Sequence, residues 1–538
     1  VYKRQSKAFG QFHQAITLRA SRQYAEEDYS AALDAIAERH AALSITTTVS
    51  EDGVLHYAEK RVAPIFHYAR GTIDSTARLE LANEVHSQIT HHGPAFALIV
   101  FKGPEYDDIL FIGHHLCTDA VSWHIVTHDF QHQLVTGVKP AELSIATGNQ
   151  NPMTAWSGWL EVQRHSEWLQ REKPYWLGIR RRLIQQPPVV ERTRSQTDAS
   201  VHAGNLLENL DGVCQRYAMR PTEVVFAALM HALFMNNVSV PAVLIEHHGR
   251  IAPIAGAPNI DNAVGWFTSL YPVVVDVQKS DAHHVLAATK EQLRSIPNYG
   301  LGYSLLHMDA DVQPNIAFND LSVAMQNASV SNLAVTDDIT GQCANRNSQT
   351  VSVECTVTAN GADAVLNVVD HDGALSGGAR KLAEDWARAL EEMRLSVRGL
   401  TGKPVRLADA LGDWRAEVVS RLGQAGIDCD WQAPEDLPQR LSSRAYVQTT
   451  RILREATSNI IKHSKAMRCD IRCTITDGDM LFVLQDDGEG ISAVVDGRLD
   501  QGHGLASMKN RAKQLQGQCL VESGAGQGTV IRLTVPLD

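Results

Sequence analysis

The C-terminal part of the sequence changes its hydrophobic period several times, and this alternation restricts the possible folds more than any other feature of the chain. Residues 381–400 and the segment that ends with residues 457–466 carry apolar side chains at helical spacing. Residues 469–490 alternate instead as a hairpin with a turn at 477–479, and residues 528–537 read as a closing strand. The pattern predicts an α/β sandwich in which helices pack against a sheet.

Length and composition set the class of protein. The 538 residues exceed what one hydrophobic core usually supports, so we expect roughly two to four compact units. The chain is 44% hydrophobic and 20% charged, and it has no apolar run near the ~20 residues that a membrane span needs. Its net charge of −12 argues against wholesale binding to nucleic acid, and an acidic carrier protein would need a local basic patch.

The eight cysteines are scattered without the spacing of a zinc site, so we interpret them as reduced thiols of a cytoplasmic protein. The sequence begins without an initiator Met, which predicts that it is a fragment. It also begins without the apolar core of a signal peptide, and we expect no membrane segment in it.

The N-terminal part alternates helical and strand patterns. A helix over 24–42 precedes an alternating strand, and residues 96–103 and 108–116 are two adjacent strands, followed by a helix from Trp123. A Trp-rich amphipathic helix over 154–170 is expected to join two halves at about 1–150 and 176–392. In the second half, residues 221–237 read as a buried helix and residues 242–250 as a strand that ends in polar residues.

Four separated stretches near the C-terminus carry candidate ligand-binding residues. Glu455 and Asn459 are four residues apart, so they share a helix face and can present oxygens, which Mg²⁺ prefers. Asp486 ends a strand before a glycine-rich loop, where its carboxylate can accept a hydrogen bond from an adenine amino group. The glycines let the backbone approach a flat ligand, and a glycine pair further on precedes a helix start that attracts phosphate.

In their order and spacing, these stretches resemble the ATPase-type catalytic domain of sensor histidine kinases of two-component systems. The resemblance covers roughly residues 395–538, and we expect an ATP-binding domain of this type over 393–538. It implies a transferase that uses ATP and Mg²⁺, with Glu455 polarising water or the metal and Asn459 binding the metal. It also implies the remaining ATP-binding residues, which are Lys462 and His463 beside the phosphates, Asp486 on the adenine, and Gly488, Gly490, Gly502, Gly504, Leu505 and Thr529 around the pocket and its lid.

One part of the kinase pattern is missing. Residues 389–414 look like the second helix of the dimerising region and its exit, but residues 376–400 contain no histidine that could accept phosphate. The resemblance therefore implies ATP binding without settling autophosphorylation. A partner protein that carries a phosphoacceptor histidine, or a response regulator, stays possible. A homodimer also stays open.

The N-terminal part carries a second group of candidate residues. His114 and His115 end a strand, Asp119 follows four residues later, and Glu246 lies at the end of another strand before a Gly-rich and aromatic segment. A histidine near neutrality and a carboxylate across a cleft are the equipment for moving protons, so we take these four residues as catalytic candidates.

The segment HHLCTDAVSW matches the pattern HHxxxDxxSW, and with it residues 5–392 resemble the condensation superfamily of nonribosomal peptide synthetases. IEHHGR, VGWFTSLYP and NYGLGYSLL are closer to its epimerisation branch. The resemblance implies a condensation/epimerisation-like domain over 1–392, built from two chloramphenicol-acetyltransferase-like halves around a tunnel. It departs from the family at His247, at Ile251 and in FNDLS, residues 318–322.

Four functions stay open at this point. The first is an epimerase that inverts Cα of an aminoacyl or peptidyl thioester, held on the phosphopantetheine arm of a peptidyl carrier protein, with His115 and Glu246 as opposed bases. The second is a condensation enzyme, which would not need Glu246. The third is a sensor whose N-terminal module only binds a ligand, and the fourth is an artificial joining of two genes.

Overall fold

The computed structural model forms two compact units, residues 1–390 and 391–538, which we describe separately. The structure describes residues 12–49, 55–71, 74–138, 151–185, 196–203, 210–236, 242–250, 254, 256–277, 281–306, 314–321, 333–336, 351–360, 363–371, 373–375, 377–398, 404–434, 437–476, 478–490, 503–524 and 526–537.

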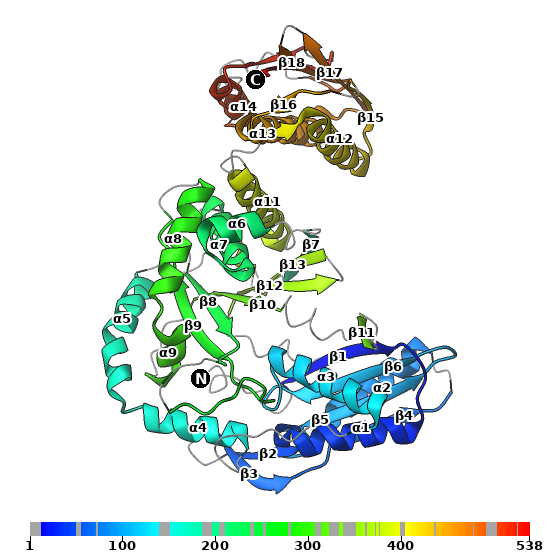
Figure 1. Ribbon diagram of the computed structural model, residues 1–538, viewed down its shortest axis with the longest axis vertical. Coiled ribbons are helices and arrows are strands. Elements are labelled where there is room, and N and C mark those ends of the chain that lie inside the picture. The colour runs from blue at the N-terminus through cyan, green and yellow to red at the C-terminus, as the bar shows by residue number, and fades with distance from the viewer. Residues whose placement is uncertain are drawn as a thin grey trace. The chain divides into compact units, whose positions relative to one another are not determined.

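The first half of the first unit is a five-stranded sheet in the order β11-β1-β6-β5-β4, covered by helices on both faces (Figure 1). Its elements are β1 (His13–Ala20), α1 (Glu26–Arg39), β2 (Ile45–Val49), β3 (Leu55–Arg61), β4 (Ile65–Ala69), α2 (Ser75–Gln88), β5 (Phe96–Lys102), β6 (Asp107–His114) and α3 (Ala120–Thr136). Strands β5 and β6 are buried along nearly their whole length because α1 and α3 cover one face of the sheet and α2 covers the other. The predicted adjacent strands are confirmed as an antiparallel pair.

The connection between the halves differs from the prediction of one helix over 154–170. It consists of α4 (Pro152–Gln163) and α5 (Glu167–Ile184). The break arises because Ser166 caps the second helix: its side chain accepts a hydrogen bond from the Leu169 amide at 3.4 Å.

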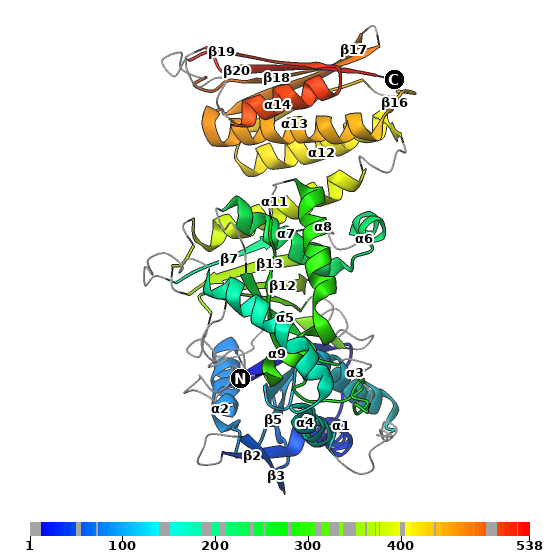
Figure 2. The ribbon, with the colours of Figure 1, turned by 90° about the vertical axis from the view of Figure 1, so that its left-hand side faces the viewer.

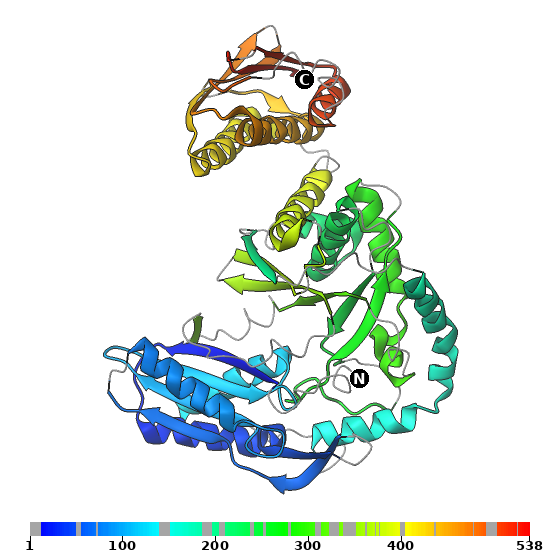
Figure 3. The same cartoon turned by 180° about the vertical axis from the view of Figure 1, so that it is seen from behind.

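The second half contains a six-stranded sheet in the order β7-β13-β12-β10-β8-β9, with helices packed against it (Figure 3). Its elements are β7 (Thr197–His202), α6 (Asp211–Tyr217), α7 (Pro221–Met235), β8 (Ala242–His247), β9 (Ser269–Val274), α8 (Ala282–Ser295), α9 (Leu301–Leu305), β10 (Ile316–Asp320), β12 (Val353–Asn360), β13 (Asp363–Asp370) and α11 (Gly378–Arg398). The predicted buried helix is α7, and the predicted strand before the polar residues is β8. Strand β11 (Leu333–Thr336) returns to the first sheet and pairs with β1, so the two halves share strands.

Helix α11 confirms the helical pattern predicted over 381–400 as far as Arg398, whereas the kinase-type helix and exit expected over 389–414 stay a prediction. Its N-terminal part packs into the first unit, where Trp386 is fully buried and its indole donates to the Val225 carbonyl at 3.0 Å. The helix ends at Arg398, and the next one begins only at Leu407. The apolar face of this helix therefore belongs in part to the core of the preceding unit.

The second unit is a five-stranded sheet in the order β15-β17-β18-β20-β19, with three helices layered on one face (Figure 2). Its elements are β14 (Val405–Arg406), α12 (Leu407–Gln424), β15 (Asp428–Gln432), β16 (Arg440–Leu441), α13 (Ser443–Asn459), β17 (Arg468–Thr476), β18 (Asp479–Asp486), α14 (His503–Gln514), β19 (Gln518–Ser523) and β20 (Thr529–Pro536). Burial alternates along β17 and β18, as expected when one face is covered and the other is open. The α/β sandwich, its hairpin and its closing strand are confirmed. No helix in the described part of the chain is long and apolar enough to cross a membrane.

Candidate active site and nucleotide site

His115 lies immediately after β6, is half-buried, and contacts two aromatic rings. The Phe12 ring stacks on the imidazole with centroids 4.7 Å apart, and the Trp266 ring of the second half lies 4.5 Å away. Its Nδ1 is 2.8 Å from the backbone carbonyl of Thr118, and its Nε2 is 3.1 Å from the side-chain amide of Gln14. A carbonyl can only accept, so Nδ1 carries the proton and Nε2 offers a lone pair, which is the form that a base requires.

His114 points the other way. It is 1% exposed, lies among other histidines of the first half, and its Nδ1 accepts a hydrogen bond from the Leu116 amide at 3.1 Å. This position gives His114 a supporting role at the end of β6, whereas His115 faces the aromatic segment of the second half.

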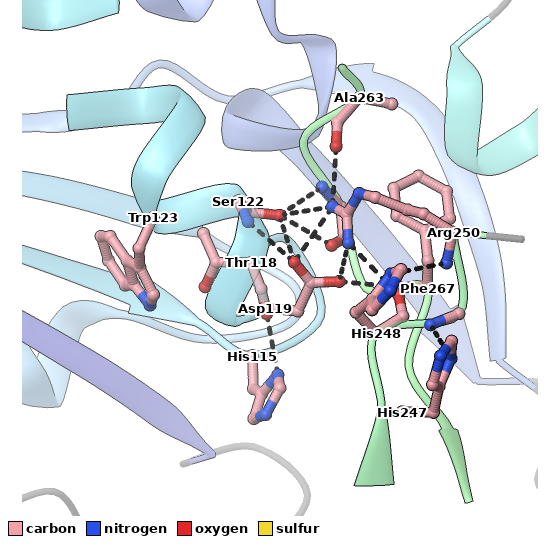
Figure 4. A network of polar contacts seen from close by, with 12 residues as sticks. His115, Thr118, Asp119, Ser122, Trp123, His247, His248, Arg250, Ala263 and Phe267 are labelled. Atoms are coloured by element: carbon pink, nitrogen blue, oxygen red, sulfur yellow. Dashed lines mark hydrogen bonds and ion pairs between the residues drawn. The ribbon is translucent and has the colours of Figure 1, made fainter. Parts of the chain in front are cut away.

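Asp119 caps α3 and forms a buried ion pair with Arg250, a residue that the sequence did not single out as its partner. The guanidinium donates to the two carboxylate oxygens at 2.8 and 3.0 Å, and both side chains are 3% exposed. Figure 4 shows the Asp119 carboxylate between Arg250 and Ser122. The amide and hydroxyl of Ser122 and the amide of Phe267 also donate to this carboxylate. Asp119 thereby joins the two halves, and its oxygens are already engaged by donors.

The glycine of the HGR segment is required by backbone geometry. Gly249 has a φ of +68°, and a Cβ at this position would lie 1.6 Å from the Phe267 carbonyl oxygen. Only glycine tolerates both conditions, and this close approach of two loops brings Arg250 to Asp119.

Glu246 lies near the end of β8 on the same face of the second sheet as two other polar residues. Asn319 of β10 donates to its carboxylate at 2.5 Å, and Glu354 of β12 is close enough to act on it electrostatically. Ala317 of β10 pairs with Leu244 of β8 and with Glu354 of β12. Side chains two residues apart on a strand point to the same face, so Glu246 and Asn319 share the face of Glu354. Burial, and then the like charge of Glu354, raises the pKa of Glu246 to about 7, although the Asn319 hydrogen bond opposes the rise. The carboxyl can therefore give or take a proton near neutrality.

The departures from the family pattern have different surroundings. His247 stacks on the Tyr299 ring at 5.3 Å, and its Nδ1 accepts from the Gly249 amide at 3.2 Å. Burial, followed by the charges of His248 and Arg220, lowers the pKa of His247 to about 3. This histidine adds bulk but no charge beside Glu246. Asp320 ends β10, whereas Ile251 and Ser322 lie outside the described residues.

The raised pKa of Glu246 predicts a pH-dependent stability. The native state keeps a proton that the unfolded chain releases near pH 4.5, so this group lowers the free energy of unfolding as pH rises from 4.5 to about 7. Glu246→Gln should remove this part of the pH dependence, on the order of 1 to 2 kcal/mol, in urea unfolding measured at pH 5 and 8. Glu354→Gln should reduce it by removing the like charge. The exposed Glu161→Gln is the control, and identical pH dependence in wild type and Glu246→Gln would contradict the assignment.

Asp486 is the buried carboxylate of the second unit. It ends β18, is 3% exposed, and accepts a hydrogen bond from the Gly488 amide at 3.0 Å. Burial raises its pKa, while backbone hydrogen bonds from Gly488 and Thr529 act in the opposite direction. Thr529 begins β20 beside it. A carboxylate held by backbone amides at a strand end is fixed in position and shielded from water, as an acceptor for an adenine amino group needs to be.

The other predicted nucleotide residues come from two segments. Glu455 and Asn459 lie partly exposed on α13, and Lys462 and His463 are exposed on the wider turn 460–464 that continues it. Gly504 and Leu505 lie at the start of α14, where Leu505 packs against the core. Gly502 lies outside the described residues. Among the described residues, no three His, Cys, Asp or Glu side chains are grouped so that they could hold a metal ion.

The structure gives a reason for the two glycines after Asp486, Gly488 and Gly490, that the sequence did not show. A Cβ on Gly488 would lie 2.2 Å from the Ser464 carbonyl oxygen, and one on Gly490, whose φ is +66°, would lie 2.1 Å from that of Gly524. The prediction assigned these glycines to close contact with a ligand. The structure shows that they already permit close contact of the loop with its neighbouring backbone.

The comparisons with known proteins agree with both patterns. The family model of the condensation domain matches residues 4–368. The chain belongs to the condensation-domain family. A second model, that of the histidine kinase-, DNA gyrase B- and HSP90-like ATPases, matches residues 446–538. The chain thus combines a condensation domain with a histidine-kinase-like ATPase domain.

Relatives of the condensation domain are peptide synthetases. A linear gramicidin synthase protein of Brevibacillus parabrevis is 34% identical over 249 residues, which are 43% of this chain and 5% of that protein. Surfactin synthase subunit 2 of Bacillus subtilis (strain 168) is 27% identical over 334 residues, or 58% of this chain and 9% of that protein. The chain therefore spans less than a tenth of the length of either synthetase.

Solved structures share the fold of the condensation domain. The epimerization domain from the third module of tyrocidine synthetase B has a TM-score of 0.61 at 21% identity, covering 72% of this chain and 92% of that one. The first condensation domain of the CDA synthetase has a TM-score of 0.52 at 15% identity, covering 71% and 91%. The predicted fold class, acetyltransferase-like halves followed by an ATPase-type sandwich, is confirmed.

Proposed function

We propose that the condensation domain is an epimerase for aminoacyl or peptidyl thioesters carried on the phosphopantetheine arm of a peptidyl carrier protein. The observation that carries the proposal is a complementary pair of groups. His115 presents a basic Nε2, and Glu246 has a pKa of about 7, so a fraction of its carboxyl is protonated at neutral pH. The similarity of the fold to the epimerization domain of tyrocidine synthetase B supports this choice within the family.

The two groups suit an inversion because each can act on one side of Cα. His115 Nε2 takes the Cα proton, the C–H bond breaks, and its electron pair spreads onto the thioester oxygen. Glu246 then gives its proton to the opposite face of Cα, and the new C–H bond forms. In the reverse direction the roles exchange, and both groups return to their starting state through solvent. We assign His114 and Asp119 to positioning, because their polar atoms are engaged within the domain.

A condensation reaction is the second candidate, since the same superfamily contains both activities and His115 could orient an attacking amine. Glu246 separates the two functions, because its half-buried position and raised pKa have no task in condensation. The test is incubation of the whole chain with a carrier-bound L-aminoacyl thioester in heavy water. Epimerisation requires uptake of deuterium at Cα and loss of stereochemical purity, whereas condensation gives neither and yields an amide when a free amine is added.

For the ATPase domain we propose binding of ATP, with Asp486 on the adenine amino group. The residues present fit the nucleotide: a buried carboxylate ends β18, and exposed Lys462 and His463 follow α13. ATP supplies a transferable phosphoryl group. Magnesium would be held by Asn459 and Glu455 together with phosphate oxygens, since it prefers oxygen ligands. Since residues 376–400 contain no histidine, the phosphate acceptor would be a partner protein, and a cytoplasmic location stays a prediction.

Asp486→Asn should weaken ATP binding about ten- to a hundredfold, because the amide offers the adenine amino group a poorer acceptor and leaves a buried polar group unsatisfied, which costs ~1 to 3 kcal/mol. Titration of the whole chain with a fluorescent ATP analogue and Mg²⁺ measures the effect. Asp479→Asn, at the exposed opposite end of the same strand, is the matched control and should bind as the wild type does. Absence of saturable binding in the wild type, or equal affinity of the two variants, would contradict the proposal.

A further inference from the structure

Three hydrogen bonds in series connect α3, β1 and the histidine of the candidate site. The indole nitrogen of Trp123 lies 3.0 Å from Gln14 Oε1, the other end of that amide lies 3.1 Å from His115 Nε2, and His115 Nδ1 lies 2.8 Å from the Thr118 carbonyl. Gln14 stands opposite Gly113 in the β1–β6 pair, and a Cβ at this glycine would lie 3.2 Å from the Trp123 ring. The lack of a side chain at Gly113 therefore gives Trp123 room to reach Gln14.

The direction of all three bonds follows from their ends. An indole N–H can only donate, so the oxygen of the Gln14 amide must face Trp123 and its NH₂ group must face His115. That NH₂ group can only donate, so Nε2 is the acceptor. At the other end the Thr118 carbonyl can only accept, so Nδ1 is the donor. Both ends select the same neutral form of the imidazole.

We propose that Gln14 is a positioning residue which, oriented by Trp123, holds His115 in its neutral Nδ1–H form with the basic nitrogen Nε2 directed at the site. This inference deepens the proposed epimerase function and rests on it for the role of the base. A proton on Nε2 would face the Gln14 NH₂ group, and Gln14 cannot turn its oxygen to this proton without losing Trp123. The arrangement therefore favours a base that holds the proton briefly and passes it on, which an inversion needs. The Gln14 amide has to move aside when the substrate arrives, since it occupies the same lone pair.

The other described groups near the ring are uncharged or already engaged by neighbours. The Phe12 ring stacks on one face of the imidazole, the tilted Trp266 ring lies 4.5 Å from it, and both rings are uncharged. Asp119, four residues further along, is neutralised by Arg250. His114 turns its Nδ1 to the Leu116 amide. The hydrogen bonds at the two ring nitrogens thus favour the Nδ1–H form of His115.

The test is ring-nitrogen NMR of the whole chain labelled with ¹⁵N-histidine, with the His115 signals assigned by their loss in His115→Ala. The wild type should show a protonated Nδ1 and an unprotonated Nε2. Gln14→Glu keeps the acceptor for Trp123 but places a negative oxygen at Nε2, so it should raise the pKa of His115 by about one to three units. Trp123→Phe frees the Gln14 amide to rotate and should also raise it, by less. Gln170→Glu adds the same charge at an exposed position of α5 and should leave the His115 signals unchanged.

In the deuterium-exchange assay, Gln14→Glu should shift the acidic limb of the pH profile upward by the same amount as the pKa. An Nε2–H form in the wild type overturns the proposal, and so does a Gln14→Glu titration equal to that of Gln170→Glu. Gln14→Met, which keeps the length and apolar stem of the side chain, covers the case in which Gln14→Glu does not fold. It should weaken the preference for the Nδ1–H form, and an unchanged preference counts against the proposal. Because the NMR measurement uses no substrate, failure of the epimerase proposal alone would appear as normal titration without deuterium uptake.

Discussion

His115→Ala and Glu246→Gln should each slow inversion of a carrier-bound aminoacyl thioester by about 10²- to 10⁴-fold, the usual loss when a positioned acid or base is removed. The reason is that the two groups work in turn. Without His115 the Cα proton of one stereoisomer has no base, and without Glu246 the opposite face has no donor. The measurement is the rate of formation of the D-isomer, determined chromatographically after cleavage of the thioester.

The two variants should differ in deuterium uptake. A domain that keeps one of the bases can still remove and return a proton on one face, so one variant should incorporate deuterium with retention of configuration for one of the two isomers. Controls are His165→Ala and Glu161→Gln, which change exposed side chains of the same types in the same unit. Loss of inversion in the controls, or full inversion in either site variant, would contradict the two-base mechanism.

A wild-type chain that shows neither exchange nor amide formation with several carriers would mean that the domain binds its ligand without chemistry. The departures from the family pattern would then be the place to seek the cause. His247 is the clearest of them, because it places an aromatic ring next to Glu246 and stacks on Tyr299. Asp320, one residue after the Asn319 that binds Glu246, is the second.

The fold could be predicted from the sequence where a pattern is local. The spacing of apolar residues shows directly which faces of an element are covered. This spacing predicted β5, β6, α7 and the β17–β18 hairpin. The break between α4 and α5 was missed because an apolar period continues across it, while a single serine side chain decides where the second helix starts. The helical period over 381–400 predicted α11, but amphipathicity shows only that a face is buried, so the burial of Trp386 in the first unit could not be predicted from it.

The candidate site was predictable in its motif residues but not in its partners. His115, Asp119 and Glu246 stand at strand ends or helix starts, where the sequence carries a signal. Gln14 and Asn319 come from strands 101 and 73 residues away from the groups that they bind, and only the register of the sheets brings them together. The sequence gives only a weak indication of the role of Arg250. A cation between two buried segments needs an anionic partner, but the sequence does not identify that partner.

Asp119→Asn should lower the free energy of unfolding of the first unit by about 3 to 5 kcal/mol, because it leaves the Arg250 guanidinium buried without its counter-ion. Asparagine is as good a helix cap as aspartate, so the hydrogen bond from the Ser122 amide to this side chain can persist and the loss reports the ion pair. Urea unfolding followed by tryptophan fluorescence measures it, since all tryptophans except Trp414 and Trp431 belong to the first unit.

The matched control is Glu26→Gln, which breaks an ion pair with Arg70 that is as short, at 2.7 Å, but has side chains 80% and 34% exposed. Its effect should stay within about 1 kcal/mol, because water replaces the lost partner. Adding Arg250→Met to Asp119→Asn should recover part of the loss, since no charge is then left unpaired in the interior. Equal effects of Asp119→Asn and Glu26→Gln would show that the pair does not hold the two halves together. A double variant as unstable as the sum of the two single variants would place the loss in packing around Phe267, on whose ring the Arg250 guanidinium lies at 4.8 Å.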